Sequence, residues 1–360
     1  MNKKRVIRIC LNVIIGIVIV AVLYLAYVFL TFHRIEDNQT LIPFNYRNAA
    51  ESVQTGKDLE LTSWNIGFAA YVQDFTFFMD GGKESRARSE DAVLDSMNHI
   101  TMKLRDQESD FYNIQEVDFD STRSYKVDER LLIRYAFRDY SYVFAQNYDS
   151  PYLFYPITRP HGKNKAGIIS LSKTRIKESL RRSLPIQTDF AKVLDLDRCY
   201  SVTRFPTDNG KEMVLVNLHL SAYTTDPSIV KKQVGMIYET MLEEYNKGNY
   251  VVCSGDFNMD LLLDSPGIFG VPLNSFSSWC NPYPVKDIPD HIELIAPFDS
   301  EKKIASCRNN DMPYERGKTF ECTVDGFLVT DNVEVVSSEV LDEQFMYSDH
   351  NPVQMHFILK

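Results

Sequence analysis

The 360-residue sequence carries a set of carboxylate, amide and imidazole side chains at the ends of apolar runs. In chain order they are Asn65, Glu116, Asn217, His219, Asp256, Asn258, Asp325, Asp349 and His350. Glu116 and Asp256 offer the hard oxygen ligands that suit Mg²⁺ or Mn²⁺. Asn65 and Asn258 can orient water and phosphate oxygens without adding negative charge.

The two histidines can donate hydrogen bonds to phosphate or exchange protons near neutral pH. Either Asp325 or Asp349 could fix a histidine tautomer. A cation that offsets phosphate charge, an oriented water and donors for the transition state are the parts that phosphate-ester hydrolysis needs. Each residue alone has an ordinary explanation as a turn, surface or core residue, but the ordered set has no comparable one.

The apolar runs beside these residues predict the strands that must position them. They include Leu59–Trp64, Phe111–Ile114, Met213–Leu220, Val251–Ser254, Thr323–Thr330 and Val353–Ile358. Helices are predicted after Ser89 and after Asp226-Pro227, where a capping residue precedes apolar positions at helical spacing. Alternating strands and helices predict a layered α/β domain, and polar residues at strand ends are where such domains commonly place a site.

Six motifs then resemble, in order, those of the endonuclease/exonuclease/phosphatase superfamily of metal-dependent phosphoesterases. They are Trp64-Asn65-Ile66-Gly67, Gln115-Glu116-Val117, Asn217-Leu218-His219-Leu220, Gly255-Asp256-Phe257-Asn258, Val324-Asp325-Gly326-Phe327 and Ser348-Asp349-His350-Asn351-Pro352-Val353. The resemblance runs from about Leu59 to Ile358. It implies a four-layer α/β/β/α sandwich of two mainly antiparallel sheets with helices outside. It also implies a hydrolase of phosphate esters that uses Mg²⁺, with Mn²⁺ as an alternative.

The resemblance also implies roles for individual residues. Glu116 would be the chief metal ligand, Asn65 would support the metal site, and Asp349 is a further candidate ligand. Asp256 would orient or deprotonate the attacking water, which Asn258 would help to position.

For the phosphate itself, the resemblance implies that His350 contacts the scissile group, with Asp325 as its orienting partner. His219 matches the histidine of the sphingomyelinase and deoxyribonuclease branches, where it serves as an acid or phosphate donor. Whether Asp256 or His350 is the general base stays open.

The stretch 146–165 is not explained by these motifs. It carries the aromatic residues Tyr148, Tyr152, Phe154 and Tyr155 and the basic residues Arg159, His161, Lys163 and Lys165. It is either a substrate loop or an ordinary surface loop with buried aromatics. We take Arg159, His161 and Lys165, together with Asn217, as candidate substrate-binding residues. Arg123 and Lys126 follow Glu116 closely and could also face phosphate, but we expect them on the surface.

The N-terminal segment predicts a membrane anchor. No charged residue occurs in 9–32, which is longer than the ~20 residues that a membrane span needs. Basic residues precede this run, and such residues stay on the cytoplasmic side. We therefore predict a cytoplasmic basic tail (1–8), a transmembrane signal anchor (9–32), a tether (33–57) and an extracytoplasmic catalytic domain (58–360), with the protein in the cell membrane as a single-pass chain.

Composition narrows the class of protein further. With 44% hydrophobic residues and 24% charged residues, the chain is globular rather than disordered. The net charge of −10 argues against a protein that depends on tight nucleic-acid binding. The cysteines leave two alternatives, a disulfide (Cys280–Cys307 or Cys307–Cys322) or buried free thiols.

Together these observations predict a membrane-anchored, outward-facing, Mg²⁺-dependent phosphoesterase. A phospholipid head group is the first expected substrate, and an extracellular nuclease is the alternative. A catalytically silent binding protein on the same fold is the alternative from another class. No obligate protein partner is evident from the sequence.

Overall fold

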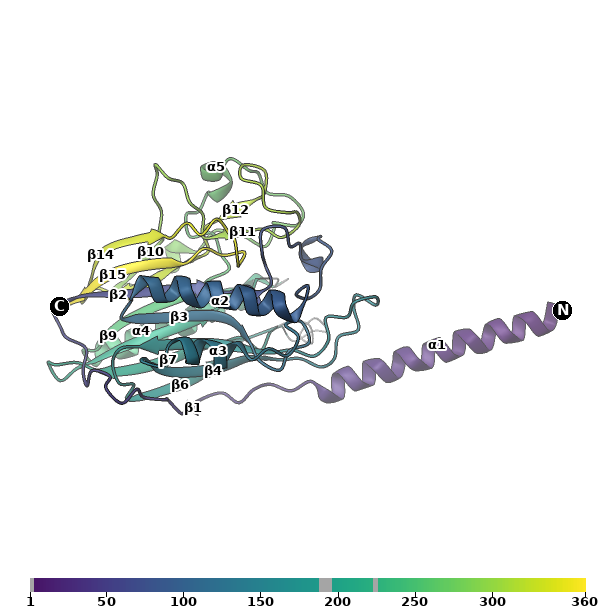
Figure 1. Cartoon of the computed structure of the whole chain (residues 1–360), viewed down its shortest axis with the longest axis horizontal. Helices are drawn as coiled ribbons and strands as arrows, with labels where there is room; N and C mark the ends of the chain where they lie inside the picture. The colour runs from purple at the N-terminus through teal and green to yellow at the C-terminus, as the bar shows by residue number, and fades with distance from the viewer. Residues whose placement is uncertain (1–2, 188–195, 223–225) are drawn as a thin grey trace.

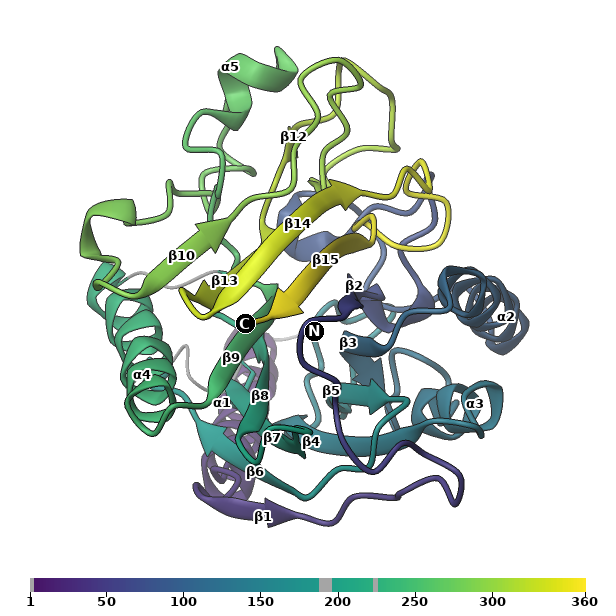
Figure 2. The ribbon, with the colours of Figure 1, turned by 90° about the vertical axis from the view of Figure 1, so that its left-hand side faces the viewer.

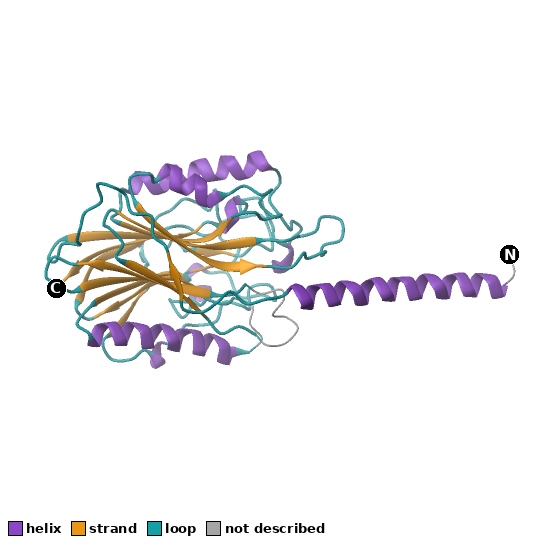
Figure 3. Ribbon diagram, turned by 90° about the horizontal axis from the view of Figure 1, so that it is seen from below, coloured by secondary structure: helices purple, strands orange, loops and turns teal. Residues whose placement is uncertain are grey.

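Two β-sheets packed face to face form the centre of the molecule, as Figure 3 shows. The structure is a computed structural model that describes residues 3–187, 196–222 and 226–360. The first sheet has six strands in the order β14 (Val333–Val340), β15 (Val353–Leu359), β2 (Asp58–Asn65), β3 (Phe111–Asp118), β5 (Lys165–Ser172) and β4 (Ser141–Asp149). The second has seven, in the order β1 (Gln39–Leu41), β6 (Glu178–Ser183), β7 (Cys199–Pro206), β8 (Glu212–His219), β9 (Tyr250–Asp256), β13 (Asp325–Thr330) and β10 (Ile292–Ile295).

Helices cover the outer faces of both sheets (Figure 2). Helices α2 (Glu90–Gln107) and α3 (Glu129–Ala136) pack on the six-stranded sheet, and α4 (Pro227–Asn246) packs on the seven-stranded sheet. Short elements complete the fold: β11 (Cys307–Arg308), β12 (Glu321–Cys322), α5 (Ser265–Phe269) and the 3₁₀ turns Gly67–Ala69, Phe78–Asp80 and Val285–Asp287. Apolar side chains from both inner faces fill the space between the sheets. The predicted four-layer sandwich is confirmed.

Each sheet contains one parallel strand pair joined through a helix. Strands β2 and β3 are parallel and connect through α2, and β8 and β9 are parallel and connect through α4. The other described pairs are antiparallel. The helix starts follow the expected chemistry, since Ser89 Oγ accepts from Ala92 N at 3.1 Å and Asp226 Oδ1 accepts from Ser228 N at 2.9 Å.

The two parallel strand pairs, β2 with β3 and β8 with β9, end close to each other. Asn65 pairs with Gln115 at the end of β2 and β3, and His219 pairs with Asp256 at the end of β8 and β9. The strand before Asp256 needs a glycine, because Gly255 has φ +146° and a Cβ there would overlap the carbonyl oxygen of Leu218. The fold therefore brings the ends of four strands to one edge.

The N-terminal helix α1 (Lys3–Thr31) extends away from the domain (Figure 1). Its length and mean hydropathy of 3.0 would allow it to cross a membrane. The segment predicted as a tether is not free of the domain, since β1 pairs with β6 and Phe44 bridges to Tyr142. All six cysteines fall within the described residues and are free thiols, so neither expected disulfide is present.

Candidate active site

A cavity lined by both charged and apolar side chains lies where the four strands end. Seven of the predicted residues line it: Glu116, His161, His219, Asp256, Asn258, Asp349 and His350. Asn65 and Asp325 do not line the cavity but hydrogen-bond to residues that do. The folded chain therefore gathers most of the predicted set around one cavity, although these residues are spread along the sequence from Glu116 to His350.

Asn65 connects the two sheets across this cavity. Its Nδ2 donates to Glu116 Oε1 at 3.3 Å and to Asp256 Oδ2 at 3.0 Å. Its Oδ1 accepts from the backbone N–H of Gly67 at 3.0 Å, which fixes the orientation of the amide. Because one amide serves two carboxylates, Asn65 holds a β3 acid and a β9 acid close together without adding charge.

Glu116 sits at an irregularity of its strand. The register of β3 against β5 shifts between Ile114 and Val117, and Glu116 has φ +55°. Such a bulge aims a side chain out of the regular pleat, and its strain is typical of functional sites. Burial raises the pKa of Glu116, and Arg123, whose Nη2 is 3.9 Å from Oε2, opposes that shift.

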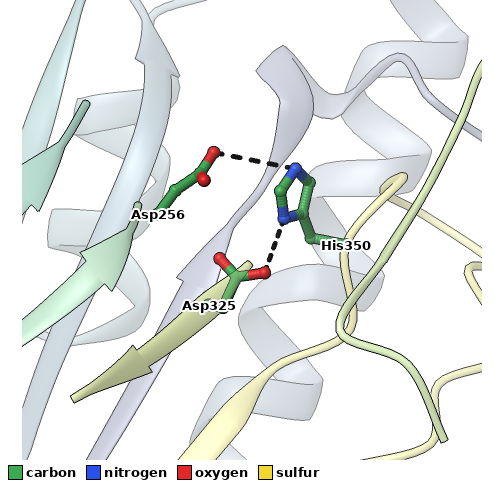
Figure 4. A group of neighbouring side chains, drawn as sticks. All are labelled: Asp256, Asp325 and His350. Carbon is green, nitrogen blue, oxygen red and sulfur yellow. Dashed lines mark hydrogen bonds and ion pairs between the residues drawn. The ribbon is translucent and has the colours of Figure 1, made fainter. Parts of the chain in front are cut away.

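Figure 4 shows His350 between two carboxylates. Its Nδ1 is 2.8 Å from Asp325 Oδ2, and its Nε2 is 3.8 Å from Asp256 Oδ2. Ser306 Oγ also donates to Asp325 Oδ2, at 2.7 Å, which positions this carboxylate. Burial acts to lower the pKa of His350, but Asp325 and other nearby groups outweigh it and raise the pKa well above its usual value. His350 is therefore an imidazolium at neutral pH and can donate from Nε2.

Asp256 is the most buried of the acidic residues that line the cavity. Its Oδ1 accepts from the backbone N–H of Asn258 at 2.8 Å, and Asn258 Nδ2 in turn donates to Leu220 O at 2.8 Å. Burial raises the pKa of Asp256, while His350 lowers it. A carboxylate with a raised pKa accepts a proton more readily than an ordinary one.

His219 differs from His350 in its protonation. Burial lowers the pKa of His219 well below its usual value, with Arg198 as a secondary cause. Its Nε2 lies 3.5 Å from Asp256 Oδ2 and 3.9 Å from Glu116 Oε1. Among the described residues, its Nδ1 has no hydrogen-bond partner. His219 is therefore neutral, whereas His350 is charged.

Asp349 lines the cavity from the segment that precedes β15. Its Oδ2 accepts from Asn310 Nδ2 at 2.6 Å, and Ser348 Oγ lies 3.3 Å from its Oδ1. Burial raises the pKa of the Tyr71 hydroxyl well above its usual value, and the nearby carboxylates of Asp349 and Glu116 raise it further. Tyr71 is therefore a neutral donor beside these two acids.

Two groups of residues could hold a metal ion. Ligand atoms of Asp256, Asp325 and His350 lie within 4.8 Å of one another, which makes them one candidate group. In that group, however, Asp325 holds His350 as an imidazolium through their 2.8 Å contact, and an imidazolium has no nitrogen lone pair for a metal ion. The predicted group of Glu116, Asn65 and Asp349 supplies oxygen ligands, and Glu116 Oε2 is too far from Arg123 for a hydrogen bond. These donors fit a hard cation better.

The candidate substrate-binding residues are spread over different environments. His161 lines the cavity, but its pKa is lowered to about 3 by burial and its Nδ1 lies 2.6 Å from Ser85 O. Its Nδ1–H therefore donates to that carbonyl, and its Nε2 can only accept. Asn217 lies between the sheets and bonds to Gln115 and Ile169.

Arg159 and Lys165 lie outside the cavity lining. The Arg159 guanidinium donates to the backbone oxygens of Ala87 and Arg88 and to the hydroxyl of Tyr125. Lys165 begins β5 and is half-buried. Their assignment to substrate stays a prediction.

Sequence reasoning missed several lining residues. Arg123, expected on the surface, is buried; it stacks 3.9 Å over the Phe68 ring and pairs with Asp118 at 2.9 Å. Arg308, Cys307, Asn310 and Trp279 come from loops and the short β11, where no periodic pattern marks them. The spacing from Glu116 to Arg123 was the one available signal, and Lys126 did prove to be exposed.

Solved structures share this architecture. A Beutenbergia cavernae endonuclease/exonuclease/phosphatase protein is 17% identical with a TM-score of 0.55, covering 84% of this chain and 72% of its own. A Bacteroides thetaiotaomicron mannosyl-6-phosphatase is 16% identical (TM-score 0.51; 83% and 99% covered), and Caenorhabditis elegans TDP2 is 15% identical (TM-score 0.50; 84% and 75%). No protein-family model matches the sequence, and no curated protein matches it significantly. The chain has the endonuclease/exonuclease/phosphatase fold.

Proposed function

We propose that the protein is a metal-dependent phosphoesterase that hydrolyses a phosphodiester, anchored in the cell membrane by α1 with its catalytic domain outside the cytoplasm. The observation that carries this proposal is the arrangement of Asp256 and His350 beside Glu116 in one cavity, with Asp325 bonded to His350 from behind the cavity lining. The solved structures with this fold include proteins named as phosphatases, which supports the reaction class.

Asp256 and His350 would divide the proton transfers. Asp256, with its raised pKa, would accept a proton from the attacking water, which Asn258 would help to position. His350, held as imidazolium by Asp325, would donate from Nε2 to a phosphate oxygen and offset the charge that develops there. The neutral His219 would add a further hydrogen bond to phosphate.

Glu116, Asn65 and Asp349 would hold the cation, which we propose is Mg²⁺, with Mn²⁺ as an alternative. When bound, the cation supplies positive charge against the phosphate oxygens. Asn65 would serve this site by keeping Glu116 close to Asp256, because its amide donates to both.

A phospholipid head group is the substrate that we favour. The anchor places the domain at a membrane, and the net charge of −10 gives no broad attraction to a polyanion. An extracellular nuclease is the second candidate. Salt separates the two, since a nuclease loses affinity steeply with salt, whereas a head-group hydrolase depends on how the lipid is presented.

The test is a hydrolysis assay on the full-length protein in detergent. Bis-p-nitrophenyl phosphate, sphingomyelin, phosphatidylinositol and plasmid DNA are offered with Mg²⁺ or with EDTA. Asp256→Ala and His350→Ala should abolish turnover, whereas Asp331→Ala and His291→Ala, which remove the exposed Asp331–His291 pair, should not. Turnover that survives EDTA or both site variants would contradict the proposal.

A folded wild-type protein that neither hydrolyses any of these substrates nor gains stability with Mg²⁺ would instead favour the catalytically silent binding protein.

A further inference from the structure

The connection between β4 and β5 is a hairpin that extends beyond the sheet. Leu153 and Gly162 pair across it through two backbone hydrogen bonds of 3.0 Å. Three large apolar side chains are exposed at its tip: Phe154 (54%), Tyr155 (68%) and Ile157 (86%). Single exposed apolar residues are ordinary, but three within four positions form a patch that calls for a partner. We call these three residues the hairpin tip.

The hairpin contacts the N-terminal helix. The Tyr24 hydroxyl donates to Tyr152 O and accepts from Phe154 N, both at 3.2 Å, and the Tyr27 hydroxyl accepts from Tyr152 N at 3.3 Å. The rings of Tyr24 and Phe154 meet edge to face at 5.3 Å. Figure 1 shows the hairpin running beside α1, past the end at which that helix joins the domain.

The position of Tyr24 in α1 indicates the depth of this contact relative to the bilayer that α1 would span. The uncharged stretch 9–32 would be about 36 Å long as a helix, against ~30 Å for the hydrocarbon core. With Arg8 at the inner surface, the outer boundary of the hydrocarbon falls near Val28. Tyr24 and Tyr27 both lie just inside this boundary, near the membrane interface, where tyrosines are enriched. Phe154, in contact with Tyr24, lies at the same level.

The cavity opens on the same side of the domain. Strands β3 and β4 are both antiparallel to β5, so they run in the same direction and end at the same edge. The hairpin therefore rises from the edge that carries Glu116. Rings also connect its tip to the cavity wall: Tyr155 lies 5.6 Å from Phe78, which lies 5.8 Å from the cavity-lining His161.

We propose that the hairpin tip inserts into the outer interfacial layer of the bilayer that α1 spans, and so holds the mouth of the cavity against lipid head groups. The inferred partner is a lipid surface because α1, which forms the other side of the contact, would itself lie in lipid. The inference rests on the membrane anchor in the proposed function and deepens it, since it makes the bilayer the source of the substrate.

The test measures depth rather than activity. Full-length Ile157→Trp is reconstituted into phosphatidylcholine vesicles with or without lipid brominated on the acyl chains, which quenches nearby tryptophan. The matched control is Leu131→Trp, on the outer helix α3, where the native side chain is 59% exposed. Trp64 and Trp279 are common to both proteins. Flotation of the vesicles establishes that the protein remains in the bilayer.

We expect stronger quenching for the residue-157 tryptophan than for the residue-131 tryptophan. Equal quenching at both positions would overturn the proposal. So would the absence of quenching at either position in vesicles that carry the protein, and that result would indicate that the hairpin tip binds a protein partner instead. A protein that does not float with the vesicles has no anchor, and the proposal fails with it.

A second variant separates lipid docking from support of the cavity. Phe154→Ser/Ile157→Ser should lower the hydrolysis of phospholipid in vesicles about tenfold, through the apolar area withdrawn from the interface, while hydrolysis of bis-p-nitrophenyl phosphate stays unchanged. Equal loss on both substrates would show that the tip merely supports the cavity. If the wild type hydrolyses neither substrate, the phosphoesterase proposal has failed, and the quenching result still decides the docking.

Discussion

Asp256 and Asp325 are direct partners in the antiparallel ladder between β9 and β13. Two buried carboxylates on paired residues repel each other when both are ionised, so a positive charge between them stabilises both. His350 supplies that charge, with Nδ1 on Asp325 and Nε2 facing Asp256. The register of two strands, rather than a loop, therefore sets the protonation of the proposed acid–base residues.

The Asp325–His350 contact should control the pH dependence of turnover. Asp325→Asn removes a charge that raises the pKa of His350, so the imidazolium is lost at a lower pH. The alkaline limb of the kcat profile should therefore move toward lower pH, and kcat at pH 8 should fall about 10²-fold. Asp331→Asn, at the exposed pair with His291, is the control and should leave the profile in place. An unchanged alkaline limb in Asp325→Asn would remove His350 as the acid.

Metal binding should be visible as a gain in thermal stability. A cation that binds only the folded state stabilises it by about 2.7 kcal/mol at one hundred times Kd. Wild type should therefore unfold at a higher temperature in Mg²⁺ than in EDTA, and Glu116→Gln should lose this difference. Glu51→Gln, whose side chain is on the surface, is the matched control. An equal response of wild type and Glu116→Gln would place the metal elsewhere, with the Asp256, Asp325 and His350 group as the next candidate.

Gly255 should not tolerate a side chain. Gly255→Ala places a Cβ against Leu218 O in a backbone conformation that L residues rarely adopt, so it should lower the free energy of unfolding by at least about 3 kcal/mol. Gly235→Ala, in α4 with open space around it, should instead raise that free energy by up to about 1 kcal/mol. Urea denaturation of both variants measures the difference, and similar values would refute the tight approach of β8 to β9.

The carboxylate of Glu244, which is not part of the cavity lining, should make the free energy of unfolding depend on pH in the acid range. Arg204, Lys247 and Asn249 hydrogen-bond Glu244 and lower its pKa to about 2, against the opposing effect of burial. A lowered pKa in the folded state stabilises the protein above the unfolded value of about 4.5, and this stabilisation disappears as the pH falls toward 2.

Glu244→Gln should therefore lower the free energy of unfolding by about 2 kcal/mol at pH 7 and by much less at pH 3. Chemical denaturation at both pH values tests this. Glu243→Gln, the neighbouring residue on α4, is the control and should show no such dependence. A deficit that stays constant with pH would mean that packing rather than charge stabilises this contact.

The sequence predicted the apolar strands at the centre of the two sheets and missed the polar strand β6. Strands such as β9 are buried on both faces, so they are continuous apolar runs that can be recognised without the rest of the fold. Strand β6, with the sequence Glu-Ser-Leu-Arg-Arg-Ser, has no such run. Its buried Arg181 is stabilised by backbone oxygens of Gln146, Glu36 and Asp197, and these partners exist only in the folded chain.

The residues of the site likewise include some that could be predicted from the sequence and some that could not. The motif residues follow recognisable strands, so their meeting at one edge could be expected. Arg308 could not be expected, because it belongs to the two-residue strand β11 and, in the folded chain, its buried guanidinium donates to Val72 O and Asn309 O. The charge states of His219 and His350 were also beyond the sequence, since both are histidines at strand ends and only their buried neighbours distinguish them.

The pairing of β1 with β6 limits the reach of the domain. Only residues 32–38 separate the end of α1 from the first residue of the sheet, and a stretch of that length spans at most about 25 Å when extended. In the proposed orientation the domain could not leave the bilayer to find a distant target. Its encounters with substrate would then be a two-dimensional search by lateral diffusion, so that turnover would follow the surface density of the phosphoester rather than its concentration in bulk solution.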